Sequence, residues 1–146
     1  MMLLQFSMRL VMDTDVIVSA MRSPSGALAE ILRRVRRSKA ALLLTVPLAL
    51  ENDAVCHRTE HRLAAALTVR RVNIFVDAVI AMAEPVETHF LWRPQLRDPN
   101  DEMVLETAVN GRADVLVTFN LRDFGQVPAR FGVAALLPRE AIKRIP

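Results

Sequence analysis

The order of apolar and polar positions along the chain predicts strands that alternate with helices. Short apolar runs have the length of strands that are buried on both faces of a sheet, and they lie at 9–12, 41–46 and 115–117. Leucine, isoleucine and valine recur at helical spacing over 27–37, 47–56, 63–83 and 99–110. Shorter strands are expected at 86–88 and 132–137. This alternation favours a three-layer α/β/α sandwich with a mainly parallel central sheet.

Three carboxylates fall where the predicted elements would direct them inward. Asp13 follows the run 9–12 directly, at the carboxyl end of a strand. Glu51 and Asp101 each share a helical stripe with apolar residues, three or four positions away. A carboxylate on a buried helix face is costly unless something pairs with it. Because carboxyl ends of parallel strands meet at one sheet edge, these three side chains are expected to converge there.

Capping offers a simpler account of some of these acids. Asp98 before Pro99 is a typical helix start, and Gly111 is expected to end that helix in a left-handed conformation. Asp98 and Asp101 then form a capping box with no chemistry. The simpler role for Asp13 is likewise to cap the turn that follows it, with no part in a functional site.

Composition and charge narrow the class of protein. The 146 residues, 52% hydrophobic and 24% charged, fit one domain over 1–146. Met8 is an alternative start, with 1–7 then a non-native or extended segment before it. A formal charge of +3 permits an anionic partner without requiring one. The single cysteine, Cys56, excludes an intrachain disulfide and favours a cytoplasmic, reducing setting. No apolar run is long enough for a membrane span. The opening MMLLQFS lacks the basic start and the long apolar stretch of a signal peptide.

The basic residues of the helix at 27–37 are either phosphate contacts or an ordinary solvated face. Arg33, Arg34, Arg36 and Arg37 crowd its last turns, where cations also interact favourably with the helix dipole. Trp92 is either a base-stacking residue or a local packing anchor.

A group of carboxylates in one place repel one another, so they take up protons or share a divalent cation. Oxygen ligands without a Cys or His cluster select Mg²⁺ or Mn²⁺ over zinc. Mg²⁺ prefers to complete its shell with water and phosphate oxygens, which makes a phosphate ester the natural substrate.

Four motifs, VMDTDVIVSA, Pro47 to Glu51, RDPNDEMVLETA and ADVLVTFNLRDF, resemble the PIN-domain family in their order along the chain. The similarity is greatest to the small VapC-like toxins of toxin–antitoxin systems. It implies a metal-dependent endoribonuclease that cleaves single-stranded RNA. It also implies a homodimer and an antitoxin partner.

The resemblance assigns a role to each matched residue. Asp13, Glu51 and Asp101 match the first three family acids and are the expected metal ligands, with Glu51 alternatively positioning the attacking water. Two residues match the position of the fourth family acid. They are Asn120, a neutral residue where many members have Asp, and the downstream Asp123. All five are therefore candidate catalytic residues.

Other functions remain open. Asp15 stands where the family usually has Asn, and together with Asn120 it favours a degenerate PIN domain that binds protein or RNA without catalysis. A haloacid-dehalogenase-type phosphotransferase matches LVMDTDVI, but Ile17 replaces the expected Thr or Val. A receiver domain lacks its acceptor Asp, because the run 41–46 is followed by Pro47.

Overall fold

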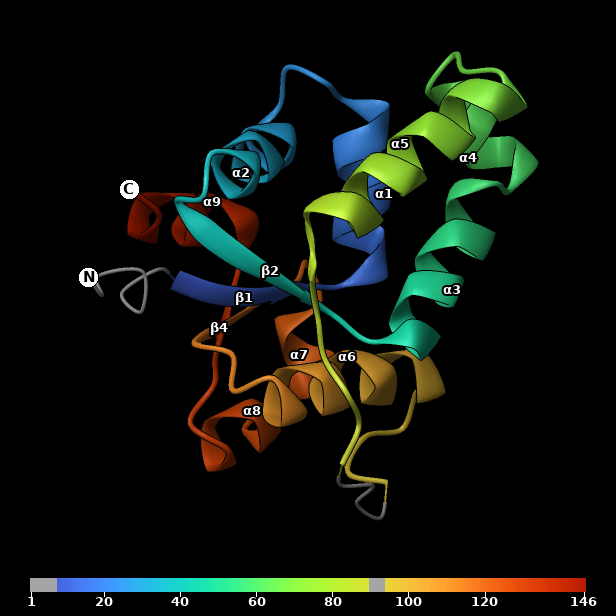
Figure 1. The fold of residues 1–146 in the computed structure, drawn as a ribbon. Helices are drawn as coiled ribbons and strands as arrows, with labels where there is room; N and C mark the ends of the chain where they lie inside the picture. The colour runs from blue at the N-terminus through green and yellow to red at the C-terminus, as the bar shows by residue number, and fades with distance from the viewer. Residues whose placement is uncertain (1–7, 90–93) are drawn as a thin grey trace.

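The computed structural model describes residues 8–89 and 94–146, and within them the strands form one five-stranded parallel sheet (Figure 1). Its order is β3-β2-β1-β4-β5. The strands are β1 (Met8–Met12), β2 (Ala40–Leu44), β3 (Glu84–Pro85), β4 (Val115–Val117) and β5 (Ala134–Leu136). The predicted α/β/α class with a parallel sheet is confirmed.

Helices connect the strands and cover both faces of the sheet (Figure 1). The first group is α1 (Thr14–Arg22), α2 (Ala27–Arg36), α3 (Val46–Cys56), α4 (Thr59–Ala64) and α5 (Val69–Met82). The second is α6 (Pro99–Asn110), α7 (Leu121–Phe124), α8 (Val127–Arg130), α9 (Pro138–Ala141) and the 3₁₀ turn η2 (Ile142–Arg144). None of the described helices is both long and apolar enough to cross a membrane.

Several elements differ from the sequence prediction. The expected strand at 86–88 is wrong, because β3 is formed by the two preceding residues. Helix α1 was not predicted, since its β-branched run VIV is typical of strands, yet its outer and inner residues follow a helical period. The short helices α7 and α8 were also missed, because four residues carry too little periodicity. Trp92 lies outside the described residues.

The two faces of the sheet carry separate hydrophobic clusters, because successive side chains of a strand point to opposite sides. Leu10 and Met12 of β1 pack in the cluster formed with α1, α2 and α5. Val11 between them packs on the other side, with Val104 and Ala108 of α6. All three β1 residues are at most 1% exposed, which explains the continuous apolar run in the sequence.

The chain reverses its direction of travel across the sheet at β1. From β1 it moves to β2 and then β3 on one side, and later to β4 and β5 on the other. The neighbours β1 and β4 therefore flank a topological switch point, and in open α/β sheets ligands bind in the crevice outside such carboxyl ends.

Gly111 does not adopt the predicted left-handed conformation at the end of α6. Its φ is −89°, whereas the next residue, Arg112, takes the left-handed value of +54°. The glycine is needed for space instead. A Cβ at this position would lie 2.9 Å from both Leu43 Cδ1 and Val86 Cγ2, where α6 meets β2 and the segment after β3.

At the amino edge of the sheet, Arg9 joins three elements. Its Nη1 and Nη2 donate to the two carboxylate oxygens of Glu84 at 3.0 and 2.7 Å, and Nη2 also donates to the Gly111 carbonyl at 2.8 Å. The guanidinium lowers the pKa of Glu84 below its usual value. Because both side chains are partly exposed, solvent screens this pair, and its main effect is to fix the ends of β1, β3 and α6 together.

Gly111→Ala is expected to destabilise the protein, although alanine is ordinarily the better residue at a helical φ. The added methyl overlaps two side chains in a close-packed interior, which costs about 1–3 kcal/mol. Urea unfolding followed by circular dichroism measures the change. Arg112→Gly is the matched control, because it relieves a left-handed L-residue and should not lower the stability. Equal stability of Gly111→Ala and the native protein would show that space is not the constraint.

Candidate active site

Asp13 lies at the carboxyl end of β1 and begins α1. Its backbone N–H continues the β1–β4 pairing by donating to the Val117 carbonyl at 2.9 Å. Its own carbonyl accepts from the N–H groups of Val16 and Ile17, which opens the helix. The residue is only 5% exposed. The backbone therefore fixes this carboxylate from both sides at the switch point.

Thr118, the residue after β4, holds the Asp13 side chain. Its Oγ1 donates to Asp13 Oδ2 at 2.9 Å and accepts from the Asn120 backbone N–H at 2.9 Å. Thr118 is fully buried, and its own N–H donates to the Leu136 carbonyl of β5. The end of β1 is thus bound to the ends of β4 and β5 through one residue, by the hydroxyl of Thr118 on one side and its backbone N–H on the other.

Asp101 reaches the same edge from α6. As predicted, it lies on the buried stripe with Val104, Leu105 and Ala108, and it is 8% exposed. Asp98 is the N-cap and accepts from the Asn100 N–H at 2.8 Å, which confirms its capping role. Among the described residues, Asp101 makes no return hydrogen bond to the start of the helix, so the capping box is incomplete.

The charges of these carboxylates act on one another. Burial raises the pKa of Asp101 to about 6, and the charges of Asp13, Asp98, Asp123 and Asp15 add to the effect. Burial also raises the pKa of Asp13, with the Thr118 hydroxyl opposing it and the charge of Asp15 adding to it. Mutual repulsion shows that the acids of β1, α1, α6 and α7 share one electrostatic environment.

An open cavity of about 630 Å³ gives solvent access to the α6 side of this group. Asp98, Asp101 and Asp123 line it, together with the guanidinium-bearing Arg97 and Arg122. Glu102 of α6 accepts from the N–H groups of Gln95 and Leu96 and so holds one wall of the cavity.

Glu51 occupies a different position from the one its stripe suggested. The buried residues of α3 are Leu48, Asn52, Val55 and Cys56, so Glu51 is half-buried at the margin of that stripe. Its charge is not among those that raise the pKa of Asp13 or Asp101. Glu51 remains a candidate ligand from the family resemblance alone.

Asn52, next to Glu51, is a buried polar residue that sequence reasoning missed. Its Oδ1 accepts from Thr14 Oγ1 at 2.9 Å, which joins α3 to the first residue of α1, directly after Asp13. Asn52 comes four residues after Leu48 and so lies on the apolar stripe of α3. That spacing was the sequence signal that its side chain is buried. Its Nδ2 is buried without a hydrogen-bond partner among the described residues.

Asn120 and Asp123, the two candidates for the fourth family acid, contribute in different ways. Asn120 precedes α7 and contributes its backbone N–H to Thr118, while its exposed side chain makes no capping bond. Asp123 is exposed in α7, lines the cavity and adds its charge to the environment of Asp101. Asp15 is exposed in the first turn of α1.

Carboxylate oxygens at this edge are the type of donor that a hard divalent cation takes. In the described ranges, no three His, Cys, Asp or Glu side chains gather closely enough to hold a metal ion by themselves. Mg²⁺ is commonly bound through one or two carboxylates, with waters and substrate phosphates completing its shell. Asp13 and Asp101, both buried and both with a raised pKa, are the residues that would hold it.

The basic end of α2 lies away from these acids. Helix α2 ends just before β2 begins, so its last turn is at the amino edge of the sheet, opposite the carboxyl end of β1 (Figure 1). Arg33 and Arg34 pair with Glu30 at 2.8 and 3.0 Å. Arg34 Nη1 also donates to the Ile142 and Ile145 carbonyls at 3.0 Å. These two arginines are structural, which favours the solvated-face interpretation for this helix.

Comparison with known families agrees with this geometry. The sequence model of the PIN domain matches residues 9–122, which include β1, α6 and β4. The chain belongs to the PIN-domain family. No curated protein matches the chain. PIN domains are generally nucleases that use divalent metals, so membership indicates a nuclease-type function for this PIN domain.

Asp101→Asn is expected to make the metal-free protein more stable at pH 7.5. Between the ordinary pKa of Asp near 3.9 and about 6, the folded state binds more protons than the unfolded state, so stability falls as pH rises through this window. Above it the penalty is fully present, on the order of 2 kcal/mol. The amide removes it, and the gain should disappear near pH 4. Urea unfolding in EDTA at both pH values measures this.

Asp77→Asn, on the exposed face of α5, is the control for loss of one negative charge. It should leave stability unchanged at both pH values. If Asp101→Asn behaved like Asp77→Asn, the repulsion at the carboxyl edge would be negligible.

Proposed function

We propose that this PIN domain is a Mg²⁺- or Mn²⁺-dependent endoribonuclease that cleaves single-stranded RNA as the toxin of a toxin–antitoxin pair. One observation carries the proposal. Two buried carboxylates, Asp13 and Asp101, come from different elements to the carboxyl edge at the switch point, and each has a raised pKa. A fold tolerates such repulsion where a ligand relieves it.

Each residue has a proposed role. A divalent cation held by Asp13 and Asp101 would supply positive charge to a scissile phosphate and lower the pKa of a water for attack. Thr118 keeps the Asp13 carboxylate in one orientation by donating its hydroxyl proton. Glu51, at the margin of α3, positions the attacking water or adds a ligand. Asp123 contributes from the α7 wall of the cavity, and Asn120 acts through its backbone N–H.

Arg97 and Arg122 are the cations best placed to receive the RNA backbone. Both line the cavity with Asp98, Asp101 and Asp123. Neither forms an ion pair with another described residue. Free guanidinium groups beside the acids attract a phosphate that the carboxylates alone would repel.

An apolar groove of about 340 Å³ supports the protein-partner part of the proposal. It runs between α1, α2 and α5, and Ile74, 58% exposed, lies along it. Arg36 and Arg71 lie on its lining and form no ion pair with another described residue, so an amphipathic segment with acidic flanks fits it. An antitoxin or a second copy of the chain would cover this surface.

The runner-up function is a PIN domain that binds RNA or protein without catalysis. Asp15 favours it, because an additional carboxylate beside Asp13 raises the cost of ionising the pair. Asn120 favours it too, because it replaces a charged ligand by a neutral one.

Cleavage of a mixed, labelled single-stranded RNA tests the function directly. We expect the native protein to cut with Mg²⁺ or Mn²⁺ and to be inert in EDTA, because the carboxylates need a cation to act on a phosphate. Asp13→Asn and Asp101→Asn should each lose at least about 100-fold in kcat/KM, the size of loss typical for a group that stabilises transition-state charge. Asp77→Asn should cut normally.

Urea unfolding of the same samples separates catalysis from folding, since Asp101→Asn is expected to fold at least as well as the native protein. Specific RNA binding by a folded native protein that never cuts with either metal would favour the binding module. Cutting that persists in both Asn variants would remove this site from the reaction.

Arg122→Ala is expected to weaken RNA binding at low salt, because one phosphate contact is lost. The slope of log affinity against log salt should become shallower by about 0.7, as for one contact on a single strand. Fluorescence anisotropy in EDTA measures both quantities. Arg37→Ala is the matched control, because it removes the same charge at the opposite edge of the sheet. Equal effects of the two variants would indicate net charge rather than a local contact.

A further inference from the structure

Phe119 presents an aromatic ring beside the acidic site. It is 48% exposed, whereas Phe124, five residues later, is 1% exposed. Its backbone is nevertheless fixed on both sides, because Thr118 bonds Asp13 and Leu136 while the Asn120 N–H bonds Thr118. The point from which the side chain leaves the backbone is therefore fixed, while the surface of the ring remains open.

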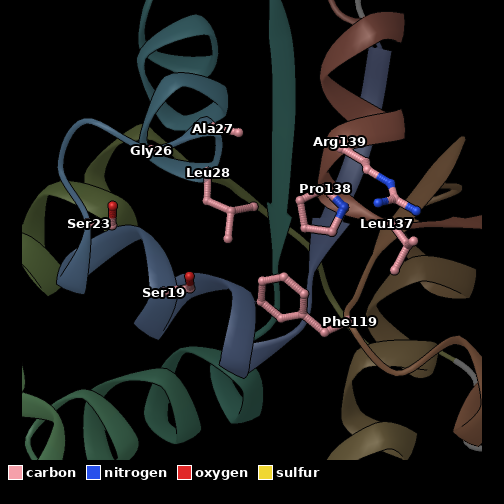
Figure 2. Close-up of a pocket in the computed structure, with 9 residues that line it drawn as sticks. All are labelled: Ser19, Ser23, Gly26, Ala27, Leu28, Phe119, Leu137, Pro138 and Arg139. Carbon is pink, nitrogen blue, oxygen red and sulfur yellow. The ribbon is translucent and has the colours of Figure 1, made fainter.

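The ring of Phe119 forms one wall of a cavity of about 440 Å³ (Figure 2). Leu28 at the start of α2 and Pro138 at the start of α9 form other apolar walls. Ser19 and Ser23 bring hydroxyl groups from α1 and its end. We call this the Phe119 pocket. It is distinct from the Asp101 cavity, and no residue lines both.

The Phe119 pocket differs from the Asp101 cavity in its charge. Among the described residues that line it, Arg139 carries the one charge, and none is a carboxylate. The guanidinium of Arg139 forms no ion pair with another described residue. Apolar walls, two hydroxyls and one free cation suit a flat, mainly apolar group with polar edges and an attached anion.

A nucleotide has this chemistry. A base can stack on an aromatic ring, hydrogen-bond through its edge to hydroxyls and place its phosphate near a guanidinium. The cavity volume lies within the range of about 300–1,000 Å³ that small-molecule sites occupy. An apolar peptide side chain would use the walls but leave Arg139 without a matching charge.

We propose that the Phe119 pocket binds one base of the RNA strand next to the bond that is cleaved, stacked on Phe119. Arg139 contacts the phosphate of that nucleotide. Since Phe119 is covalently adjacent to Thr118, which touches Asp13, a base in the pocket places the neighbouring phosphate toward the acids. The inference rests on the proposed function, because it assigns a subsite to that same RNA.

The test uses Phe119→Leu, which keeps an apolar side chain but removes the aromatic face, and Phe119→Trp, which keeps stacking. The probe is a short uridine oligonucleotide with 2-aminopurine at one position, moved along the strand in successive samples. Binding is measured in EDTA, so that cleavage is not needed. Leu63→Ala on α4 is the control for loss of an exposed apolar side chain outside the pocket.

With the native protein, we expect quenching of 2-aminopurine at one position of the strand, as stacking on the ring requires. Phe119→Leu should lose this quenching and bind about 5- to 150-fold more weakly, the range for one lost base–aromatic stack. Phe119→Trp should retain both, and Leu63→Ala should match the native protein. With metal present, Phe119→Leu should also lose the preference for the cut position.

Other outcomes overturn the subsite or the function separately. Normal cutting with unchanged affinity and cut pattern in Phe119→Leu would reject the subsite and leave the nuclease in place. Phe119-dependent quenching without cutting by the native protein would reject the nuclease and retain the base site. Unchanged RNA binding with lost self-association of Phe119→Leu in sedimentation would assign the pocket to a protein contact instead. Failure of the native protein to bind RNA would reject both proposals.

Discussion

The Thr118 hydroxyl accepts a hydrogen bond from the Asn120 N–H and donates its single proton to the Asp13 carboxylate. This short relay holds the end of β1 against the end of β4, where the chain changes its direction across the sheet. The first turn of α1 begins from Asp13, and Phe119 lies in the chain between Thr118 and Asn120. Removing the hydroxyl would therefore disturb a strand end, a helix start and a ring together.

The acidic site is tolerated because the rest of the sheet is strongly apolar. The central strands are buried on both faces, in two clusters that do not depend on the carboxylates. The repulsion is confined to the carboxyl edge, where the Asp101 cavity admits solvent. The protein thus separates the region that supplies stability from the region that stores unfavourable charge. Such a division is common where a site must be ready to take up a cation or an anionic substrate.

The sequence predicts the layers of this fold well, because buried strands and amphipathic helices have distinct periods. The Asp101 stripe and the Asp98 cap follow from spacing alone and are confirmed. Helix α1 could not be found this way, since β-branched residues in a short element fit a strand equally well. Gly111 shows a further limit, because the space around a residue depends on β2 and β3, which are distant in sequence.

The candidate site was predicted unevenly for the same reason. Asp13 and Asp101 lie where strand ends and helix periods direct them. The burial of Asn52 beside Thr14 depends on how α3 packs on α1, which a single-helix pattern does not specify. The Phe119 pocket requires α1, α2 and α9 to meet around one ring, and no local motif encodes that meeting (Figure 2).

The brevity of the outer strands limits how copies of the chain can associate. Edge strands with unpaired N–H and C=O groups invite another chain to extend the sheet. Here β3 has two residues, one of them Pro85, which has no N–H to offer, and β5 at the other edge has three. Neither edge provides a template for continuous strand addition. Within the described residues, the sheet edges therefore disfavour strand addition, and an assembly through helical surfaces would join separate sheets rather than build one wider sheet.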